Sequence, residues 1–121
     1  MGKGGLAQLW EQLGGDIDGE AADDGSGISV SLSADGTRVA IGANLNDGNG
    51  NASGHTRIYK YNGTQWEQLG QDIDGEDAVD FSGDSVSLSA DGTRVAIGAH
   101  NNIGGGGTRA GHTRVYELVT R

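Results

Sequence analysis

The sequence contains no cysteine, no proline and only one phenylalanine. Without cysteine the chain can form neither a disulfide framework nor a thiolate metal site. No apolar run approaches the roughly 20 residues that a membrane span needs, and the N-terminus lacks the hydrophobic core of a signal peptide. We expect residues 1–5 to be a remnant of expression, in which case the missing signal says nothing about where the parent protein resides.

Large apolar side chains are scarce as well. Leu, Ile, Val and Phe account for 23 of 121 residues, and the net charge is −9. This pairing is typical of disordered chains, but here the apolar residues alternate with polar ones in short regular runs, which predicts strands. The acidic balance argues against nucleic acid and anionic membrane surfaces as partners, because both attract basic patches.

The sequence consists of one unit written twice. Both copies begin with WEQLG, at Trp10 and Trp66, and the run SVSLSADGTRVAIGA occurs unchanged at 29–43 and 85–99. The offset between the copies is 56 residues up to Ala99 and 57 residues beyond it. A period of this length predicts a stack or ring of similar units, each of which buries its apolar faces mainly against neighbours.

The first half of each unit has the pattern of a β-hairpin. Apolar residues and serines alternate along 28–33, which predicts a strand with one face buried more fully than the other. Asp35-Gly36 predicts a tight turn into a second strand at 38–43. In that strand Ala40 and Gly42 are small enough for a neighbouring sheet to come close.

The second half of the unit predicts two further strands. A third strand at 56–61 would place Ile58 on one face and Arg57, Tyr59 and Tyr61 on the other. The dipeptide Asn62-Gly63 predicts a turn into a fourth strand at 65–73.

The predicted fold class is all-β, because no stretch combines helical periodicity with caps at both ends. Four antiparallel strands in a unit of about 56 residues are typical of a β-propeller blade. A β-sandwich would not explain the duplication, and the rungs of a β-solenoid are usually shorter.

The repeat is out of phase with the ends of the chain, which begins with a strand of the fourth type, Leu6–Ile17, and ends with one of the third type, His112–Val119. We therefore divide it into an outer strand plus a first blade, 6–65, and a second blade that lacks its own outer strand, 66–121. We expect the spare strand to complete the second blade of another copy. A homotrimer would then give six blades and a homotetramer eight.

Three short motifs carry a family resemblance. They are Ser26-Gly27-Ile28-Ser29-Val30, Ala34-Asp35-Gly36 and Val39-Ala40-Ile41-Gly42-Ala43. In this order they resemble the FG-GAP repeats of integrin-α-like β-propellers, over nearly the whole chain and twice over. The resemblance implies an extracellular or cell-surface parent with a recognition or adhesion role, and a protein or glycan as its ligand.

The sequence departs from the family pattern in places that matter for calcium. The family's Phe is Ser26 and Ser82 here, and its Pro is Asn44 and His100. Where many members hold calcium in a long acidic loop, this chain has a short turn with one carboxylate, whereas calcium takes six to eight oxygen ligands. The resemblance is therefore to a calcium-free variant, and we expect no cofactor.

Acidic residues gather at the crossing between units and are the best candidates for a site. They are Asp16, Asp18, Glu20, Asp23 and Asp24, with the counterparts Asp72, Asp74, Glu76, Asp77 and Asp80. Carboxylates at i, i+2 and i+4 around a glycine can converge on calcium, although the full EF-hand spacing is absent. Alternatively, these side chains cap turns and accept hydrogen bonds from backbone N–H groups.

A nearby loop is also rich in side-chain oxygens. Its residues are Asn46, Asp47, Asn49 and Asn51. The second copy has Asn101-Asn102-Ile103 and a run of glycines instead, so we interpret the loop as a flexible surface turn and not as a metal site shared by both copies.

The histidines and tryptophans repeat between the copies. We expect His55 and His112 to be hydrogen-bonded structural residues at strand starts, although a closed ring would gather them into a circle that could collect a metal or an anion. The large apolar residues of the WEQLG segments are expected at blade interfaces, and stacking on carbohydrate is the alternative for the tryptophans. They are Trp10, Leu13, Trp66 and Leu69.

No nucleophile motif such as G-x-S-x-G occurs, and no catalytic constellation is recognisable, so we expect no enzymatic activity. The leading hypothesis is a non-enzymatic propeller scaffold of recognition or adhesion type, present here as a self-assembling two-blade fragment that arose by duplication or design. The alternative is a calcium-dependent, lectin-like or adhesion-like binding module.

Overall fold

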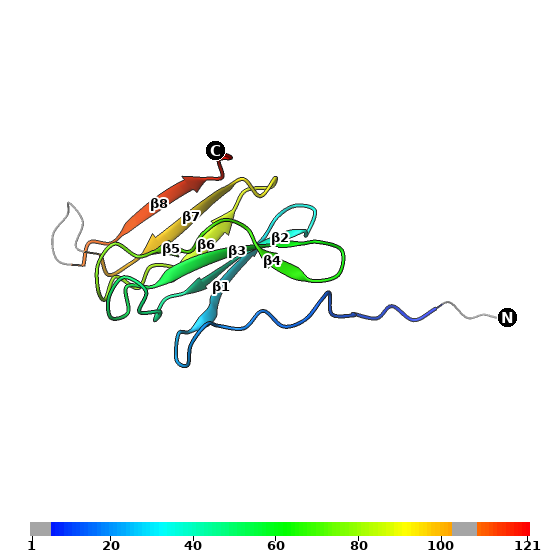
Figure 1. Cartoon of the computed structure of the whole chain (residues 1–121), viewed down its shortest axis with the longest axis horizontal. Helices are drawn as coiled ribbons and strands as arrows, with labels where there is room; N and C mark the ends of the chain where they lie inside the picture. The colour runs from blue at the N-terminus through cyan, green and yellow to red at the C-terminus, as the bar shows by residue number, and fades with distance from the viewer. Residues whose placement is uncertain (1–5, 103–108) are drawn as a thin grey trace.

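A computed structural model describes residues 6–102 and 109–121. The expected expression remnant, 1–5, and the second copy's loop from Ile103 onward lie outside the described residues. Within the described ranges the chain is all-β, with no helix, and forms two antiparallel sheets (Figure 1). This part of the chain contains no helix long and apolar enough to cross a lipid bilayer.

The first copy builds a five-stranded sheet and the second a three-stranded sheet. The strands of the first are β1 (Ser26–Leu32), β2 (Arg38–Ala43), β3 (His55–Tyr61), β4 (Trp66–Gln68) and β5 (Ile73–Asp74). The order is β1-β2-β3-β4, with β5 paired to β3. The second sheet has the order β6-β7-β8, from strands β6 (Ser85–Leu88), β7 (Arg94–Ala99) and β8 (His112–Glu117).

The predicted Asp-Gly hairpins are confirmed, because β1 pairs with β2 and β6 with β7 in antiparallel register. At the first turn the Asp35 carboxylate accepts hydrogen bonds from the backbone N–H and the hydroxyl of Thr37, at 3.0 and 2.8 Å, and from Ser33 at 3.0 Å. These bonds, led by that of the Thr37 N–H, hold the pKa of Asp35 below its ordinary value. Asp91 makes the same bonds in the second copy.

The fourth strand is shorter than predicted. It is divided into β4 and β5, and the residues between them, Leu69–Asp72, leave the ladder. Gly70 lies in this break with φ +79°, a backbone conformation that glycine adopts without strain. Both pieces still pair with β3, so the prediction of a fourth strand beside the third holds apart from this break.

The two sheets pack against each other through opposite faces. We call the face of the first sheet that carries serines its serine face (Ser29, Ser31, Ala40, Gly42, Ile58) and the other its aliphatic face (Val30, Leu32, Val39, Ile41, Tyr59). By sequence equivalence, the second sheet has a serine face (Ser85, Ser87, Ala96, Gly98, Val115) and an aliphatic face (Val86, Leu88, Val95, Ile97, Tyr116). The serine face of the first sheet covers the aliphatic face of the second.

The core lies between these two faces. Ala40 and Ile58 from the first sheet pack with Val95 and Ile97 from the second, and half-buried apolar side chains surround them. As the small residues predicted, the backbones come close here: a Cβ atom on Gly42 would collide with the Gly83 carbonyl just before β6. Ser29 donates to that carbonyl at 2.7 Å, and Ser31 accepts from the Leu88 N–H at 2.9 Å.

The first strand of the unit has one face buried more fully than the other, as predicted, and the more buried face is the one with serines. In β1 the alternating serines face the neighbouring sheet, while Ile28, Val30 and Leu32 are exposed. The physical reason is that the first sheet covers the aliphatic face of the second, whereas no sheet among the described residues covers the aliphatic face of the first.

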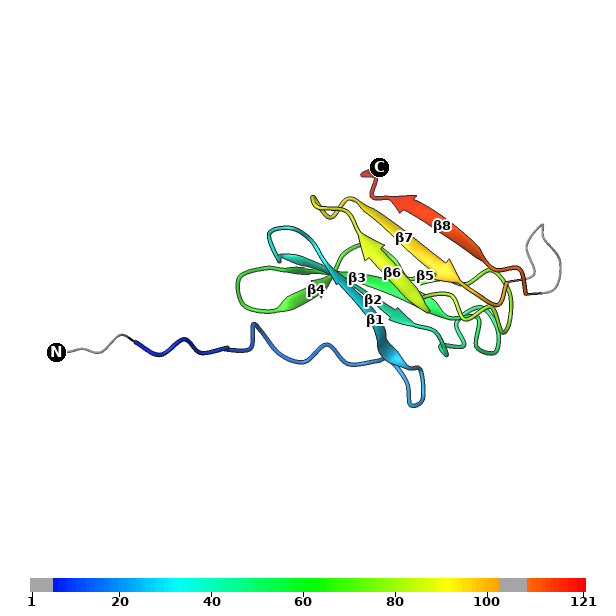
Figure 2. The same ribbon diagram turned by 180° about the vertical axis from the view of Figure 1, so that it is seen from behind.

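The N-terminal segment does not form the predicted strand. Residues 6–17 belong to no ladder within the described part of the chain, and Trp10 is fully exposed, with a relative accessibility of 103%. Figures 1 and 2 show this segment running away from the sheets, on the side of β1 and far from β8. A strand forms only beside a partner, and the edge strand β8 is out of its reach within one chain.

Candidate functional site

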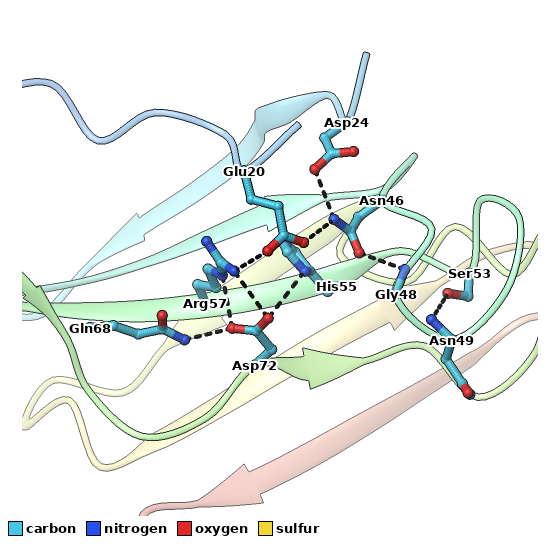
Figure 3. Close-up of polar contacts among 10 residues, drawn as sticks. All are labelled: Glu20, Asp24, Asn46, Gly48, Asn49, Ser53, His55, Arg57, Gln68 and Asp72. Atoms are coloured by element: carbon cyan, nitrogen blue, oxygen red, sulfur yellow. Dashed lines mark hydrogen bonds and ion pairs between the residues drawn. The ribbon is translucent and has the colours of Figure 1, made fainter. Parts of the chain in front are cut away.

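The first copy contains a polar cluster around Arg57 of β3 (Figure 3). The Arg57 Nε donates to Asp72 at 2.8 Å and the Nη2 to the other oxygen of Asp72 at 3.1 Å. The same Nη2 donates to Glu20 at 2.6 Å. One guanidinium is thus shared by a carboxylate from the segment before β1 and a carboxylate from the segment between β4 and β5.

Hydrogen bonding keeps both carboxyl groups ionised. The bonds from Arg57, with help from Gln68 at 2.6 Å, hold the pKa of Asp72 below its ordinary value against the opposing effect of burial. The pKa of Glu20 is lowered first by a hydrogen bond from Asn46 and then by the charge of Arg57. In return, the hydrogen bonds to Asp72 raise the pKa of Arg57.

Asn46 holds the cluster together from the loop between β2 and β3. Its side chain is buried and donates to both Glu20 and Asp24 at 2.8 Å, while its carbonyl oxygen accepts from the Gly48 N–H at 2.8 Å. The prediction of a flexible surface turn is therefore wrong for this residue, because the turn is fixed by these bonds and by Asn49, which donates to two backbone carbonyls.

The second copy repeats this arrangement with Asn102, which donates to Asp80 at 2.7 Å and to Glu76 at 3.2 Å. The composition of the two loops hides this equivalence, because the second copy has a run of glycines where the first has polar residues. The 56-residue offset, carried on past Ala99, aligns Asn46 with Asn102 and would have found it.

His55 lies beneath the first cluster at the start of β3, as predicted. It is buried, and its Nδ1 lies 3.9 Å from an oxygen of Asp72. The expected hydrogen bond is missing at this atom, which has no partner among the described residues. A buried nitrogen without a hydrogen-bond partner is unusual in a folded protein.

The second cluster is built from the same residue types but is less complete. Arg114 of β8 donates to Glu76 and, at 3.2 Å, to the hydroxyl of Tyr116. The hydrogen bond that the guanidinium donates to the Tyr116 hydroxyl is the main reason that the pKa of Arg114 is raised. The side chains are also more open: Arg114 is 38% exposed against 18% for Arg57, and His112 is 25% exposed against 4% for His55.

The acidic runs do not gather in the way that calcium would require. Among the described residues, the groups with three ligand atoms close together are Glu20, His55, Asp72 and Glu76, Asp80, His112. Neither group combines the i, i+2, i+4 carboxylates of one run, such as Asp16, Asp18 and Glu20 or Asp72, Asp74 and Glu76. Instead, four of these carboxylates accept hydrogen bonds from arginine, asparagine or glutamine side chains, namely Asp16, Glu20, Asp72 and Glu76.

The tryptophans have different surroundings in the two copies. Trp66 begins β4, is half-buried, and lies with its ring centroid 5.3 Å from that of Tyr61. Its Nε1 donates to the backbone carbonyl of Leu13 at 2.9 Å, and Leu69 packs against the core. Trp10 and Leu13 are exposed, so an interface role for them stays a prediction.

Two sheet faces are covered by no other sheet among the described residues, and their counterparts form the core. On the aliphatic face, Val30 is 63% exposed, whereas its counterpart Val86 is half-buried between the sheets. On the serine face, Val115 is 67% exposed, whereas its counterpart Ile58 is 8% exposed. The chain therefore exposes one aliphatic face and one serine face, the two kinds of surface through which its own sheets pack together.

A scan against protein-family models finds no match for this chain, and a search of curated proteins finds none either. The resemblance to FG-GAP repeats therefore depends on the short motifs of the sequence.

Proposed function

We propose that this chain is a non-enzymatic scaffold that assembles head to tail with copies of itself, each contributing two blades to a β-propeller ring. The supporting observation is the pair of uncovered faces. Within the chain, the serine face of the first sheet covers the aliphatic face of the second sheet. The aliphatic face of the first sheet carries the same residues as that covered face, position for position. Because the two faces differ, the contact is heterologous and must either close into a ring or continue as a filament.

The exposed N-terminal segment supports the same proposal. Residues 10–20 and 66–76 are identical except at Gly15, where the second copy has Gln71. The second of these segments supplies β4 and β5 to the edge of β3. The first supplies no strand within the chain, and β8, the counterpart of β3, is an edge of its sheet. In the proposed ring the segment 6–17 pairs with β8 of another copy.

The proposed register follows from the pairing in the first copy. There Tyr59 is opposite Gln68, and Thr56 is opposite Ile73. The equivalent pairs between two copies are Tyr116 with Gln12 and Thr113 with Ile17. A paired edge also removes the hazard of an open row of backbone N–H and C=O groups.

The experiment is a measurement of solution mass by light scattering, together with one face variant. We expect three chains, giving six blades, or four, giving eight. Val115→Asp places a charge on the free serine face and should dissociate the assembly without loss of β structure, because this side chain is exposed in the single chain. A folded monomer from the unmodified chain would refute the proposal.

Val79→Asp is the matched control. Val79 is also an exposed apolar residue, and the first copy already has an aspartate, Asp23, at the equivalent position with nearly the same φ, 63° against 61°. This substitution should leave the mass unchanged. If it dissociates the assembly as Val115→Asp does, the effect comes from added charge and not from the face.

The resemblance to integrin-α-like repeats extends this proposal to recognition of a protein or glycan by the ring. A glycan array tests whether the ring binds glycans, and such binding should require the assembled state.

Metal-dependent binding is the second candidate. It is favoured by the grouping of Glu20, His55 and Asp72, with the unpartnered Nδ1 of His55 facing the carboxylate. It is opposed by Arg57, which already forms ion pairs with both carboxylates. We expect a chelator to leave the melting temperature unchanged and added calcium to have no effect. A large drop in melting temperature with chelator would favour this candidate over the metal-free scaffold.

A further inference from the structure

The second polar cluster has a vacant carboxylate position when it is compared with the first. In the first copy the guanidinium of Arg57 binds two carboxylates, Glu20 and Asp72. In the second, Arg114 binds Glu76, and no other carboxylate among the described residues forms an ion pair with it. Glu76 is the counterpart of Glu20, so the position that corresponds to Asp72 is the one that remains to be filled.

The residue that matches Asp72 in sequence is Asp16. It lies 56 residues before Asp72, within the segment that is nearly identical in the two copies. The local conformation is shared as well: Gln12 donates to Asp16 at 2.8 Å, just as Gln68 donates to Asp72 at 2.6 Å. The Asp16 carboxylate is therefore already oriented by its own segment and has one oxygen left for a guanidinium.

Asp16 does not reach Arg114 within one chain. It lines a groove with Val30, Leu32 and Trp66 on the uncovered aliphatic face of the first sheet. Figures 1 and 2 show that the N-terminal segment and β8 lie on opposite sides of the molecule. A contact between them has to form between two copies.

We infer that Glu76, His112 and Arg114 form a carboxylate-binding site, and that its ligand is Asp16 of a second copy of this chain. This inference rests on the proposed assembly and names the contact that fixes its register. Arg114 would donate to Asp16 as Arg57 does to Asp72, with Glu76 as the second carboxylate. His112 would be covered by the incoming segment, as His55 is covered beneath Asp72.

The site gives the exchanged strand a defined position. The backbone pairing of a strand with β8 could slip by two residues and keep the same faces in contact. A bidentate bond between a guanidinium and a carboxylate has one good geometry, and thus favours the register that places Asp16 beside Arg114.

The test compares assembly of the unmodified chain, Asp16→Asn and Asp18→Asn by analytical ultracentrifugation over a dilution series. Asp18 is the matched control, since it is an exposed aspartate in the same segment for which the structure shows no side-chain hydrogen bond. We expect Asp16→Asn to raise the dissociation constant of the assembly about tenfold, an effect between those of losing a surface ion pair and a buried one. Asp18→Asn should change this constant less than about twofold.

A charge exchange makes the test specific for the pair. Asp16→Lys and Arg114→Glu should each dissociate the assembly, and the chain that carries both should regain it. Asp16 is exposed, so its substitution leaves the fold of the single chain intact, and circular dichroism of Arg114→Glu checks that variant.

The possible failures are distinguishable. If the unmodified chain is a monomer, the proposed scaffold function fails. If the chain assembles but Asp16→Asn behaves like Asp18→Asn, or if the double variant is no better than the single ones, the scaffold survives and the Asp16 site is refuted.

Discussion

The two copies are nearly the same sequence in two different environments. Around Arg57 the cluster is complete, the outer strand is paired, and the serine face is buried. Around Arg114 a carboxylate is missing, the edge of β8 is open, and the serine face is exposed. Since the residues are equivalent, the difference comes from position in the chain alone. A partner that completes the second copy would have to supply a carboxylate, an outer strand and a cover for the serine face. The first copy receives all three from the chain that follows it.

The largest effect is expected from placing a charge on the aliphatic face of either sheet. Val86→Asp puts a carboxylate between the sheets and should destabilise the single chain by about 3 kcal/mol or more. Its counterpart Val30→Asp should leave the single chain folded and abolish assembly, because Val30 is exposed. Thermal melts and solution mass separate the two outcomes. Equal loss of stability in both variants would contradict the difference between the faces.

The next effect is expected at the tryptophans. Trp66→Ala removes the contacts with Tyr61 and Leu13 and should cost about 2–3 kcal/mol, less than a fully buried tryptophan because Trp66 is half-buried. Trp10→Ala should leave β content unchanged and weaken assembly. Deleting residues 1–14 should abolish the closed assembly altogether. If Trp10→Ala changes neither mass nor melting curve, Trp10 is not an interface residue and is available for carbohydrate stacking.

Mixing the two charge variants distinguishes a ring of three chains from a ring of four. In an equal mixture of Asp16→Lys and Arg114→Glu chains, matched contacts form only when the two kinds of chain alternate. An odd ring cannot alternate, so a three-chain assembly predicts that the mixture forms no closed ring. A closed four-chain ring in native mass spectrometry would instead assign eight blades.

Acid should weaken the pairing of Asp72 with Arg57 in the first cluster. The pKa of Asp72 is lowered in the folded chain, so its contribution to stability is present above its ordinary pKa of 3.8 and is lost as pH falls through the lower, folded value. Asp72→Asn should therefore reduce the loss of stability between about pH 5 and pH 2. Asp23→Asn, at an exposed residue, is the control. Equal acid sensitivity of both variants would contradict the role of the Arg57 pair.

The smallest effect is expected at Glu117 of the edge strand β8, where the first copy has Lys60. Lys60 of β3 is opposite Glu67, whereas the equivalent pair between copies would be Glu117 with Glu11, two like charges. Glu117→Lys should strengthen assembly by about 0.2–1 kcal/mol, and Lys60→Glu should lower the stability of the first sheet by a similar amount. Weaker assembly of Glu117→Lys would argue against the proposed register.

Much of the local structure was predictable from the sequence. The Asp35-Gly36 and Asn62-Gly63 turns, the strands on either side of them, and the close approach at Ala40 and Gly42 follow from short-range rules that act within a few residues. Which face of each strand is buried was not predictable from such short-range rules. A period of two shows that β1 has an apolar face, but not which face meets a neighbour.

The candidate site was predicted only in part. Its acidic residues were recognised, but their partners Asn46 and Arg57 come from segments 22 to 37 residues further along the chain and meet them only in the folded sheet. Local spacing suggested that the carboxylates converge on a cation. The tertiary structure instead gives Glu20, Asp24 and Asp72 shared donors, Asn46 and Arg57, which lie on β3 and the loop before it.

The sequence by itself determined the repeat, the strands, their turns and the all-β class, since these depend on alternation and turn chemistry. Only the tertiary structure decided that serines and not aliphatic residues line the inner side of the first sheet, that Asn46 is buried, and that residues 6–17 pair with no strand in the described part of the chain. These outcomes depend on which neighbour covers each face and edge. The sequence of one repeat is the same whether or not another repeat lies beside it, so it does not show how many neighbours are present.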